Sequence, residues 1–240
     1  MLLVLLMRHG ESEANATKQD IPDPDITALG VAQADAWRAR SATWELETVL
    51  VSPLLRTIQT AARAFGAHPS ARWQLCPAAR EHWWDMRQSR GRLGGEIAPA
   101  LAELPACGLT AEAVVAAIGA PTEHWHPTEE AAASKRELGR RSARATLALA
   151  TDLTRRAAAG EKRVAVVCHW GVVSALTDVD AANCDVVGLL FHPGPAAESG
   201  RRNAYRDAVA ALGWSYDVLG PWTSADAIPL LEPARGATPP

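Results

Sequence analysis

The stretch LLVLLMRHGESEAN, residues 2–15, decides the fold of this chain. Its first six residues form an apolar run that is long enough for a fully buried strand and too short for a helix. The run stops at Arg8, His9 and Gly10. Ligands of an open α/β sheet bind beyond the carboxyl ends of its strands, so we expect Arg8 and His9 to face such a crevice. The guanidinium of an arginine presents a planar fork of donors that can bind phosphate, and a neutral histidine can act as a nucleophile or general base. The alternative is an ordinary polar turn after a buried strand.

The composition indicates a globular protein and argues against several classes of partner. The 240 residues suffice for one large α/β domain or two small ones, and a 48% apolar content argues against global disorder. The net charge of -3 offers no basic footprint for nucleic acid or an anionic membrane. No apolar run approaches the ~20 residues of a membrane span. We therefore expect a soluble, cytoplasmic protein with neither nucleic acid nor membrane as a partner; its oligomeric state is left open.

The cysteines predict neither a zinc site nor a disulfide framework, because they are widely spaced and form no C-x-x-C pair. A reducing compartment suits them. They are Cys76, Cys107, Cys168 and Cys184.

Two helices follow the first strand, and each begins with a recognisable signal. Thr27 is the expected N-cap of a helix reaching about residue 44, whose tryptophans we interpret as core. After an apolar strand at residues 48–51, Ser52 and Pro53 predict the N-cap and first residue of the next helix. Arg56 lies in the first turn of that helix, off its apolar stripe. It is either a solvent-exposed side chain or an anion ligand at the positive end of the helix.

Further elements complete an alternation of strands and helices. A weaker strand candidate leads to Glu81, and residues 82–130 are interpreted as an insertion that covers a site, because they are too long for a simple connection. A single domain is expected over residues 1–220, followed by a Pro-rich tail at residues 221–240. The other expected elements are strands at 73–76, 164–168, 186–191 and 214–219 and helices at 131–158 and 170–176.

Charged groups follow four of these strands. Alternating strands and helices imply a mostly parallel sheet with helices on both faces, whose carboxyl ends share one edge. Burying so many charged groups together is costly without a charged ligand. The sequence therefore predicts an anion site at this edge of the sheet. The residues delivered there are Arg8, His9, Arg56, Glu81 and His169.

With these residues in place, the chain resembles the histidine phosphatase superfamily, which has the phosphoglycerate mutase-like fold. The matching stretches are RHGESEAN at 8–15, DITALG at 25–30, VSPLLRTIQTA at 51–61, REHW at 80–83 and VVCHWG at 166–171. The resemblance implies a three-layer α/β sandwich and a phosphatase that works through a phosphohistidine.

The resemblance also implies roles for individual residues. His9 is the nucleophile that becomes phosphorylated, and Glu81 is the proton donor to the leaving group. Arg8, Arg56 and His169 hold the phosphoryl oxygens. Ser12 and Asn15 match positions near the phosphate.

The physical chemistry of phosphoryl transfer agrees with these roles. The reaction needs positioning and stabilisation of charge on the equatorial oxygens, which cationic and donor groups supply. The guanidiniums should lower the pKa of His9 and keep it neutral. Burial beside Trp83 and Trp84 should raise the pKa of Glu81, although an ion pair with Arg80 is the alternative for this carboxylate. We expect a small phosphorylated substrate, and neither a metal nor another cofactor.

Two other functions fit the same pattern. A phosphoglycerate mutase-type phosphomutase would share the first step and return the phosphoryl group, and a non-catalytic phosphate- or phosphopeptide-binding module would keep only the fold. Ala14 stands where the mutases usually carry an aromatic residue. We interpret His124 and His126 as loop histidines rather than metal ligands. The loop arginines Arg87, Arg90 and Arg92 are either solvated or recruit substrate.

Overall fold

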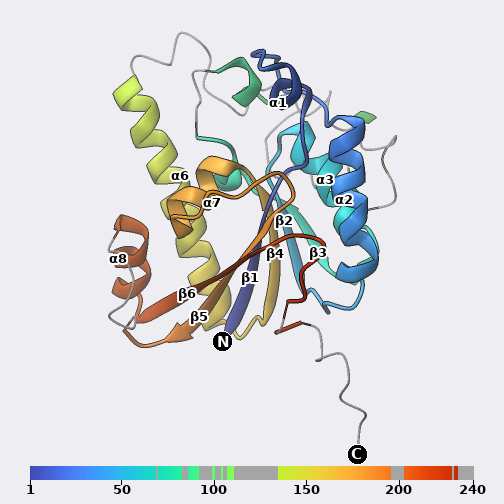
Figure 1. The fold of residues 1–240 in the computed structure, drawn as a ribbon. Coiled ribbons are helices and arrows are strands. Elements are labelled where there is room, and N and C mark those ends of the chain that lie inside the picture. The colour runs from blue at the N-terminus through green and yellow to red at the C-terminus, as the bar shows by residue number, and fades with distance from the viewer. Residues whose placement is uncertain are drawn as a thin grey trace, which may run out of the picture.

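A computed structural model describes residues 1–68, 70–82, 86–91, 99–100, 104, 107–110, 135–195, 203–228 and 230–231. Its centre is a six-stranded sheet in the order β3-β2-β4-β1-β5-β6 (Figure 1). The strands are β1 (Leu2–Arg8), β2 (Thr48–Val51), β3 (Arg72–Leu75), β4 (Arg163–Cys168), β5 (Val186–Pro193) and β6 (Trp214–Trp222).

The first four strands of that order run parallel, β5 runs antiparallel to β1, and β6 runs antiparallel to β5. β1 lies in the middle, parallel to β4 on one side and antiparallel to β5 on the other. β2 pairs in parallel with both β3 and β4. The carboxyl ends of β1, β2, β3 and β4 therefore meet at one edge of the sheet, as the sequence predicts.

Helices cover both faces of the sheet, which gives the expected three-layer α/β sandwich (Figure 1). α2 and α3 pack on one face, and α6, α7 and α8 pack on the other. The helices are α1 (Glu13–Thr17), α2 (Ala28–Ser41), α3 (Leu55–Phe65), α6 (Lys135–Ala158), α7 (Trp170–Thr177) and α8 (Ala204–Ala211), with short 3₁₀ turns η1 (Pro77–Ala79) and η2 (Arg87–Ser89).

The apolar side chains of β1 pack into the hydrophobic clusters on both faces of the sheet, because successive side chains of a strand point to opposite faces. Leu3, Leu5 and Met7 join the cluster that contains the α2 and α3 side chains. Leu2, Val4 and Leu6 join the cluster on the side of α6, α7 and α8. A strand buried on both faces reads as a continuous apolar run, and this is why the run at residues 2–7 signals its place in the fold.

The helix after β2 begins later than its sequence signal predicts. Leu54 is its N-cap, and Leu55 is its first residue, so the expected start at Ser52 and Pro53 is wrong by two residues. The side chain of Asp23, from a distant loop, accepts a hydrogen bond from the Leu55 backbone N–H at 2.9 Å. A cap supplied from elsewhere in the chain leaves no local signal, and Ser52 has another partner, described below.

The C-terminal segment is folded farther than expected. β6 continues to Trp222, two residues into the stretch assigned to a tail, and Ile228 is fully buried. Arg40 of α2 donates hydrogen bonds to backbone carbonyls of Ser224 and Asp226. Of the expected tail, residues 229 and 232–240 lie outside the described residues.

Most of the expected insertion at residues 82–130 also lies outside the described residues, as do Trp83, Trp84, Arg92, His124 and His126. Within the described part of the chain, no helix has both the length and the apolar content to cross a membrane.

Candidate functional site

His9, Arg56 and His169 meet at the carboxyl edge of the parallel strands. The imidazole rings of His9 and His169 lie with their centroids 5.2 Å apart. Arg56 bridges them: its Nε donates to His9 Nε2 at 3.3 Å, and its Nη2 donates to His169 Nδ1 at 3.2 Å. All three side chains are almost completely buried. The sequence therefore predicts the meeting of these three residues correctly, and the alternative of a solvent-exposed Arg56 is wrong.

The His9 ring is fixed in a tautomer that suits a nucleophile. Its Nδ1 lies 2.7 Å from the carbonyl oxygen of Gly10, so Nδ1 carries the proton and donates it. Nε2 then keeps its lone pair, toward which the Arg56 N–H points. Burial, reinforced by Arg56 and Arg8, holds the pKa of His9 well below its ordinary value. His9 is consequently a neutral imidazole with a directed lone pair.

A close approach of two glycines shapes the loop that carries His9. A Cβ on Gly10 would lie 2.7 Å from the Gly30 carbonyl oxygen, and a Cβ on Gly30 would lie 2.2 Å from the Glu11 carbonyl oxygen. Both positions therefore exclude any side chain. Thr60 of α3 adds a further constraint, because its hydroxyl accepts the Gly10 backbone N–H at 3.0 Å. The glycines of the RHG and TALG stretches thus pack the loop that carries His9 against the start of α2.

Arg8 offers a second guanidinium to the site. Its Nη1 donates to the Ala181 carbonyl oxygen at 2.7 Å, which fixes the group from the α7–β5 loop. Its Nε is buried and has no hydrogen-bond partner among the described residues. A buried N–H of a cation without an acceptor is costly, and an anionic oxygen would satisfy it.

Arg56 is anchored on its outer side. Nη1 donates to the Gln88 carbonyl oxygen at 2.8 Å and lies 4.0 Å from the Asp23 carboxylate. Because Asp23 also caps α3, it couples the start of the helix to the guanidinium in the first turn of that helix. The side chain is therefore held by groups on both sides, with Nε and Nη2 turned to the two histidines.

His169 is the N-cap residue of α7 and is completely buried. Since Arg56 can only donate, Nδ1 of His169 accepts, and Nε2 donates to the Ser52 hydroxyl at 2.8 Å. Burial, together with Arg56 and His9, holds the pKa of His169 well below its ordinary value. The Ser52 hydroxyl therefore orients this histidine instead of capping α3, which explains the misplaced helix start.

Glu81 reaches the same site from the segment after β3. One carboxylate oxygen, Oε1, accepts the backbone N–H groups of His82 at 2.8 Å and Gly171 at 3.2 Å. Burial raises the pKa of this carboxyl, against the opposing effect of those donors and of Arg56 and Arg8. The raised pKa is as expected, but the tryptophans invoked for it lie outside the described residues. The neighbouring Arg80 donates to the Ser89 carbonyl oxygen at 2.9 Å.

Ser12 and Asn15 form a capping box at the start of α1. The Ser12 hydroxyl accepts the Asn15 backbone N–H at 3.3 Å, and the Asn15 side chain accepts the Ser12 backbone N–H at 3.2 Å. Asn183 donates to both the Asn15 side chain and the His9 carbonyl oxygen. These contacts support the loop that holds His9, and the phosphate contacts expected for Ser12 and Asn15 stay predictions.

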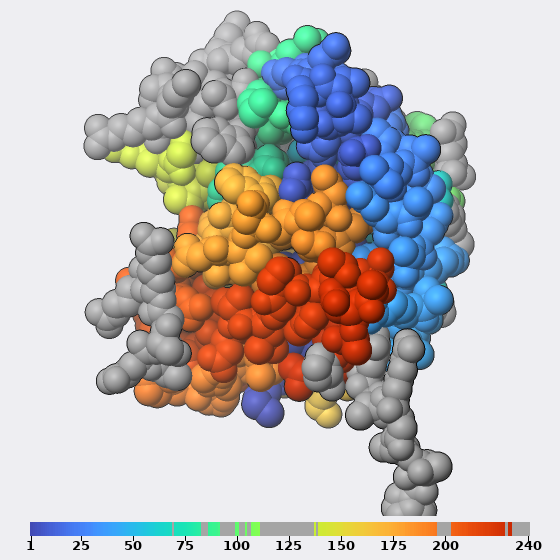
Figure 2. Space-filling view, in the orientation of Figure 1, coloured from blue at the N-terminus to red at the C-terminus, as the bar shows by residue number. Residues whose placement is uncertain are grey.

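The α7–β5 loop contributes supports that sequence reasoning missed. Ala181 and Asn183 bind Arg8 and the His9 carbonyl, and the Cys184 backbone N–H donates to the Arg8 carbonyl at 3.1 Å. Figure 2 shows this part of the chain, in orange, packed beside the N-terminal segments in blue. These partners are about 170 residues from the first motif in sequence, and no local pattern marks them. Ser52, Asp23 and Thr60 lie inside or near the quoted motifs, but their residue types predict a helix cap for Ser52 and no site role for the other two.

The 3₁₀ turn η2 lies next to the site, since its Gln88 carbonyl contacts Arg56. Asp20 holds this turn by accepting the backbone N–H groups of Arg87 and Gln88, both at 2.9 Å. The Arg87 side chain is exposed. Two of the three loop arginines, Arg87 and Arg90, therefore lie on a turn adjacent to the site, and Arg92 is outside the described residues.

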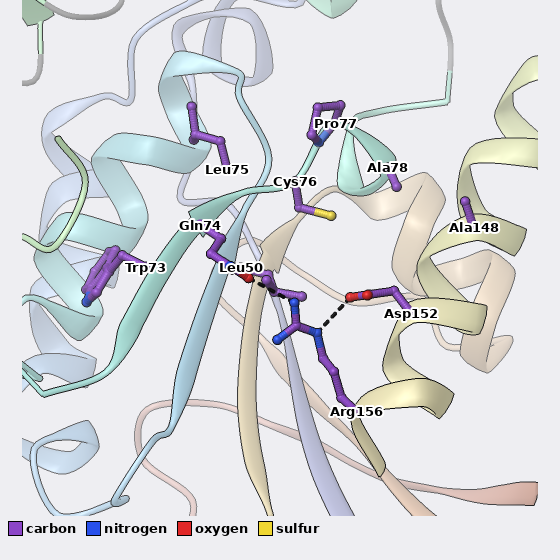
Figure 3. Close-up of a pocket in the computed structure, with 10 residues that line it drawn as sticks. All are labelled: Leu50, Trp73, Gln74, Leu75, Cys76, Pro77, Ala78, Ala148, Asp152 and Arg156. Atoms are coloured by element: carbon purple, nitrogen blue, oxygen red, sulfur yellow. Dashed lines mark hydrogen bonds and ion pairs between the residues drawn. The ribbon is translucent and has the colours of Figure 1, made fainter. Parts of the chain in front are cut away.

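A separate pocket of about 600 Å³ lies between β3, η1 and α6 (Figure 3). Gln74, Asp152 and Arg156 line it, and Arg156 is bound by the other two. None of the residues predicted for catalysis lines this pocket. Among the described residues, no three His, Cys, Asp or Glu side chains gather in a group that could hold a metal ion.

The chain is similar to known proteins in its sequence and in its fold. The model of the histidine phosphatase superfamily (branch 1) matches residues 4–180. Among curated proteins, no match was found.

Several solved structures share the fold at low sequence identity. "Mycobacterial hydrolase 1" is 15% identical with a TM-score of 0.53, covering 93% of this chain and 100% of that one. "Mycobacterial hydrolase 2" is 17% identical with a TM-score of 0.51, covering 96% and 94%. A putative alpha-ribazole-5'-P phosphatase from Escherichia coli K-12 is 18% identical with a TM-score of 0.51, covering 79% and 90%.

Proposed function

This chain belongs to the histidine phosphatase superfamily, branch 1, and from that membership and the geometry of the site we propose that it is a metal-independent phosphatase. It hydrolyses a phosphomonoester through a phosphohistidine on His9. The observation that carries the proposal is the His9 ring, neutral and with its Nε2 lone pair directed into a cluster that contains two guanidiniums. A neutral, oriented imidazole is what nucleophilic catalysis requires.

In the first step, His9 Nε2 attacks the phosphorus atom and a P–N bond forms while the bond to the leaving oxygen breaks. The protonated Glu81 carboxyl gives its proton to that oxygen, and the alcohol departs. In the second step, a water attacks the phosphohistidine. The Glu81 carboxylate takes the proton of this water, and inorganic phosphate leaves as the P–N bond breaks. Glu81 thus acts first as general acid and then as general base.

The cationic groups stabilise the phosphoryl oxygens in both steps. The buried Nε of Arg8 and the Nε and Nη2 groups of Arg56 are the donors available for them. His169 joins when a phosphoryl oxygen replaces Arg56 at Nδ1. Its proton can then sit on Nδ1, because the Ser52 hydroxyl is able to donate to Nε2 as well as accept from it.

Trapping the intermediate tests the proposal. After brief incubation with a reactive aryl phosphate and denaturing quench, we expect an acid-labile, base-stable phosphate on His9. His9→Ala should abolish the adduct and lower phosphate release by about a thousandfold or more while the protein stays folded. Full activity of His9→Ala would exclude His9 as the nucleophile.

The same assay separates the alternatives. A phosphatase releases inorganic phosphate from the adduct, whereas a phosphomutase passes it to an added acceptor alcohol or phosphoglycerate. A binding module forms no adduct. Activity should survive EDTA, and a complete loss that added metal restores would contradict metal independence. A panel of sugar phosphates, phosphoglycerates, nucleotides and phosphopeptides would define the substrate class.

A further inference from the structure

We propose that His82, clamped by Ser142 and Thr146 of α6, is a positioning residue that aims the Glu81 carboxyl at the leaving group. The inference rests on the proposed role of Glu81 as general acid. His82 itself touches neither the substrate nor the transferred proton. It acts through its backbone N–H, which donates to Glu81 Oε1 at 2.8 Å.

Two contacts fix His82 to α6, one through its backbone carbonyl and one through its ring. The Ser142 hydroxyl donates to the His82 carbonyl oxygen at 2.6 Å. The ring Nε2 of His82 shares a 2.5 Å hydrogen bond with the Thr146 hydroxyl. Ser142 and Thr146 are four residues apart, so they lie on one face of α6, and both are buried. Burial lowers the pKa of His82 to about 4, so the ring is neutral at the pH of ordinary assays.

The clamp determines which oxygen of Glu81 can carry the proton. The His82 and Gly171 backbone groups both donate to Oε1. An oxygen that accepts two N–H groups is the carbonyl oxygen of a protonated carboxyl, so the proton belongs on Oε2. A shift of the His82 backbone would release one of these donors and let the carboxyl rotate. The hydroxyls of α6 therefore set the direction in which the acid delivers its proton.

The clamp also gives α6 a role beyond covering the sheet. Leu149 and Leu153 of this helix are fully buried in the core. A helix anchored in this way is a rigid base for hydroxyls that must hold a loop to within a fraction of an ångström. Gly171, the second donor to Oε1, belongs to α7, so two helices of one layer contribute to holding the acid.

Thr146→Val and Ser142→Ala test the clamp without replacing His82 itself, because each removes one partner of that residue. We expect the double variant to lose about three- to tenfold in kcat on an alkyl phosphate, which needs the proton. An activated aryl phosphate should change less than about twofold, and KM should change little for either substrate. Thr146→Ser keeps the hydroxyl and should retain wild-type kinetics. Thr151→Val is the matched control, because the Thr151 hydroxyl donates only to the Leu147 carbonyl of α6 among the described contacts.

Glu81→Gln distinguishes failure of the inference from failure of the proposed acid. If Glu81→Gln slows the alkyl phosphate selectively but the clamp variants slow both substrates equally, or neither, the positioning role is wrong. If Glu81→Gln shows no selectivity for the leaving group, the acid role itself is wrong. In the Glu81→Gln background, the clamp substitutions should cause no further loss on the alkyl phosphate. A loss of the same size there would also overturn the inference.

Discussion

Arg56 points its Nε–H at the Nε2 lone pair of His9 across 3.3 Å, so one guanidinium faces the atom that we propose forms the bond to phosphorus. The same guanidinium reaches His169 through Nη2 at 3.2 Å. A bound phosphoryl group can take over both donors at once, because the guanidinium fork matches two oxygens. Arg56 thereby arranges the site electrostatically for an anion and links the two rings.

Arg56→Lys should test this arrangement directly. A lysine keeps the charge but presents a single ammonium, so we expect kcat/KM to fall by about a hundredfold or more. Arg63→Lys is the control, because Arg63 lies on the same helix and pairs with Asp35 in a half-exposed position. Steady-state kinetics and a thermal unfolding scan of both variants provide the measurement. A loss of less than about fivefold in folded Arg56→Lys protein would show that charge alone suffices.

Glu81 should give the pH profile its alkaline limb. Burial raises the pKa of this carboxyl, and its protonated form is the active one in the first step, so turnover of an alkyl phosphate should fall as the pH rises through that pKa. Glu81→Gln should lose about 10²–10⁴-fold on the alkyl phosphate and much less on an activated aryl phosphate. Profiles of kcat against pH for both substrates check this. Equal losses, or an alkaline limb that persists in the variant, would assign the limb to another group.

Gly171→Ala should disturb the acid rather than the fold. An added Cβ would lie 2.5 Å from Glu81 Oε1 and 3.1 Å from the His82 side chain, so the carboxylate must move. We expect about a tenfold loss on the alkyl phosphate, with the aryl phosphate nearly unaffected. Gly139→Ala on α6 is the control, since nothing lies within 4 Å of its added methyl group. That control should be as active as wild type and about 0.5–1 kcal/mol more stable. Unchanged kinetics of Gly171→Ala would mean that the carboxyl tolerates the shift.

Stability should decline on acidification. Burial lowers the pKa values of His9, His82 and His169, and the pKa of His82 is about 4. On acidification these rings therefore stay neutral in the folded protein, whereas they gain protons in the unfolded chain. The unfolded state then binds more protons, and the free energy of unfolding falls as the pH drops below about 6.5, by up to about 1.4 kcal/mol per pH unit for each ring. Glu81 acts in the opposite sense, because its raised pKa favours the folded state in acid, but it is one group against these three rings and His68, whose pKa burial also lowers.

Urea unfolding at a series of pH values between about 7.5 and 4.5 measures this slope. His82→Gln should show a shallower slope, because it removes one of the three rings. A free energy of unfolding that stays constant or rises toward pH 4.5 would contradict the neutral state of the buried histidines.

Arg87→Ala should weaken recognition of substrates with a second anionic group. Arg87 is exposed on η2, next to the residue whose carbonyl contacts Arg56, and Asp20 fixes its backbone. One lost charge-assisted hydrogen bond corresponds to about a tenfold rise in KM for a substrate with an additional carboxylate or phosphate. A small aryl phosphate should be unaffected, and the exposed Arg155 of α6 offers a control substitution to Ala. If both substrates respond alike, or neither does, Arg87 is a solvated charge.

The central parts of the fold and of the site could be predicted, because short stretches of neighbouring residues are enough to indicate them. The apolar runs of β1, β2 and β4 are buried on both faces, and each is followed within a few residues by an arginine or histidine of the site. What could not be predicted depends on partners remote in the chain. Asp23 caps α3 from another loop, and the Ser52 hydroxyl hydrogen-bonds His169 instead of capping a helix. Ala181 and Asn183 hydrogen-bond Arg8 and the His9 carbonyl, although they lie about 170 residues farther along the chain. The antiparallel direction of β5 was likewise not marked by any pattern in its own residues.

The position of β1 has a consequence for the order of events during synthesis. Its two neighbours are β4 and β5, whose residues 163–193 leave the ribosome long after residues 2–8. Until then, the most apolar strand of the protein has both edges unpaired, and segments of this kind aggregate readily. Parallel pairing over such a sequence distance is also intrinsically slow. Residues 2–8 are therefore open to aggregation until β4 and β5 have been made, and the proposed site becomes complete only after the α7–β5 loop has followed β4.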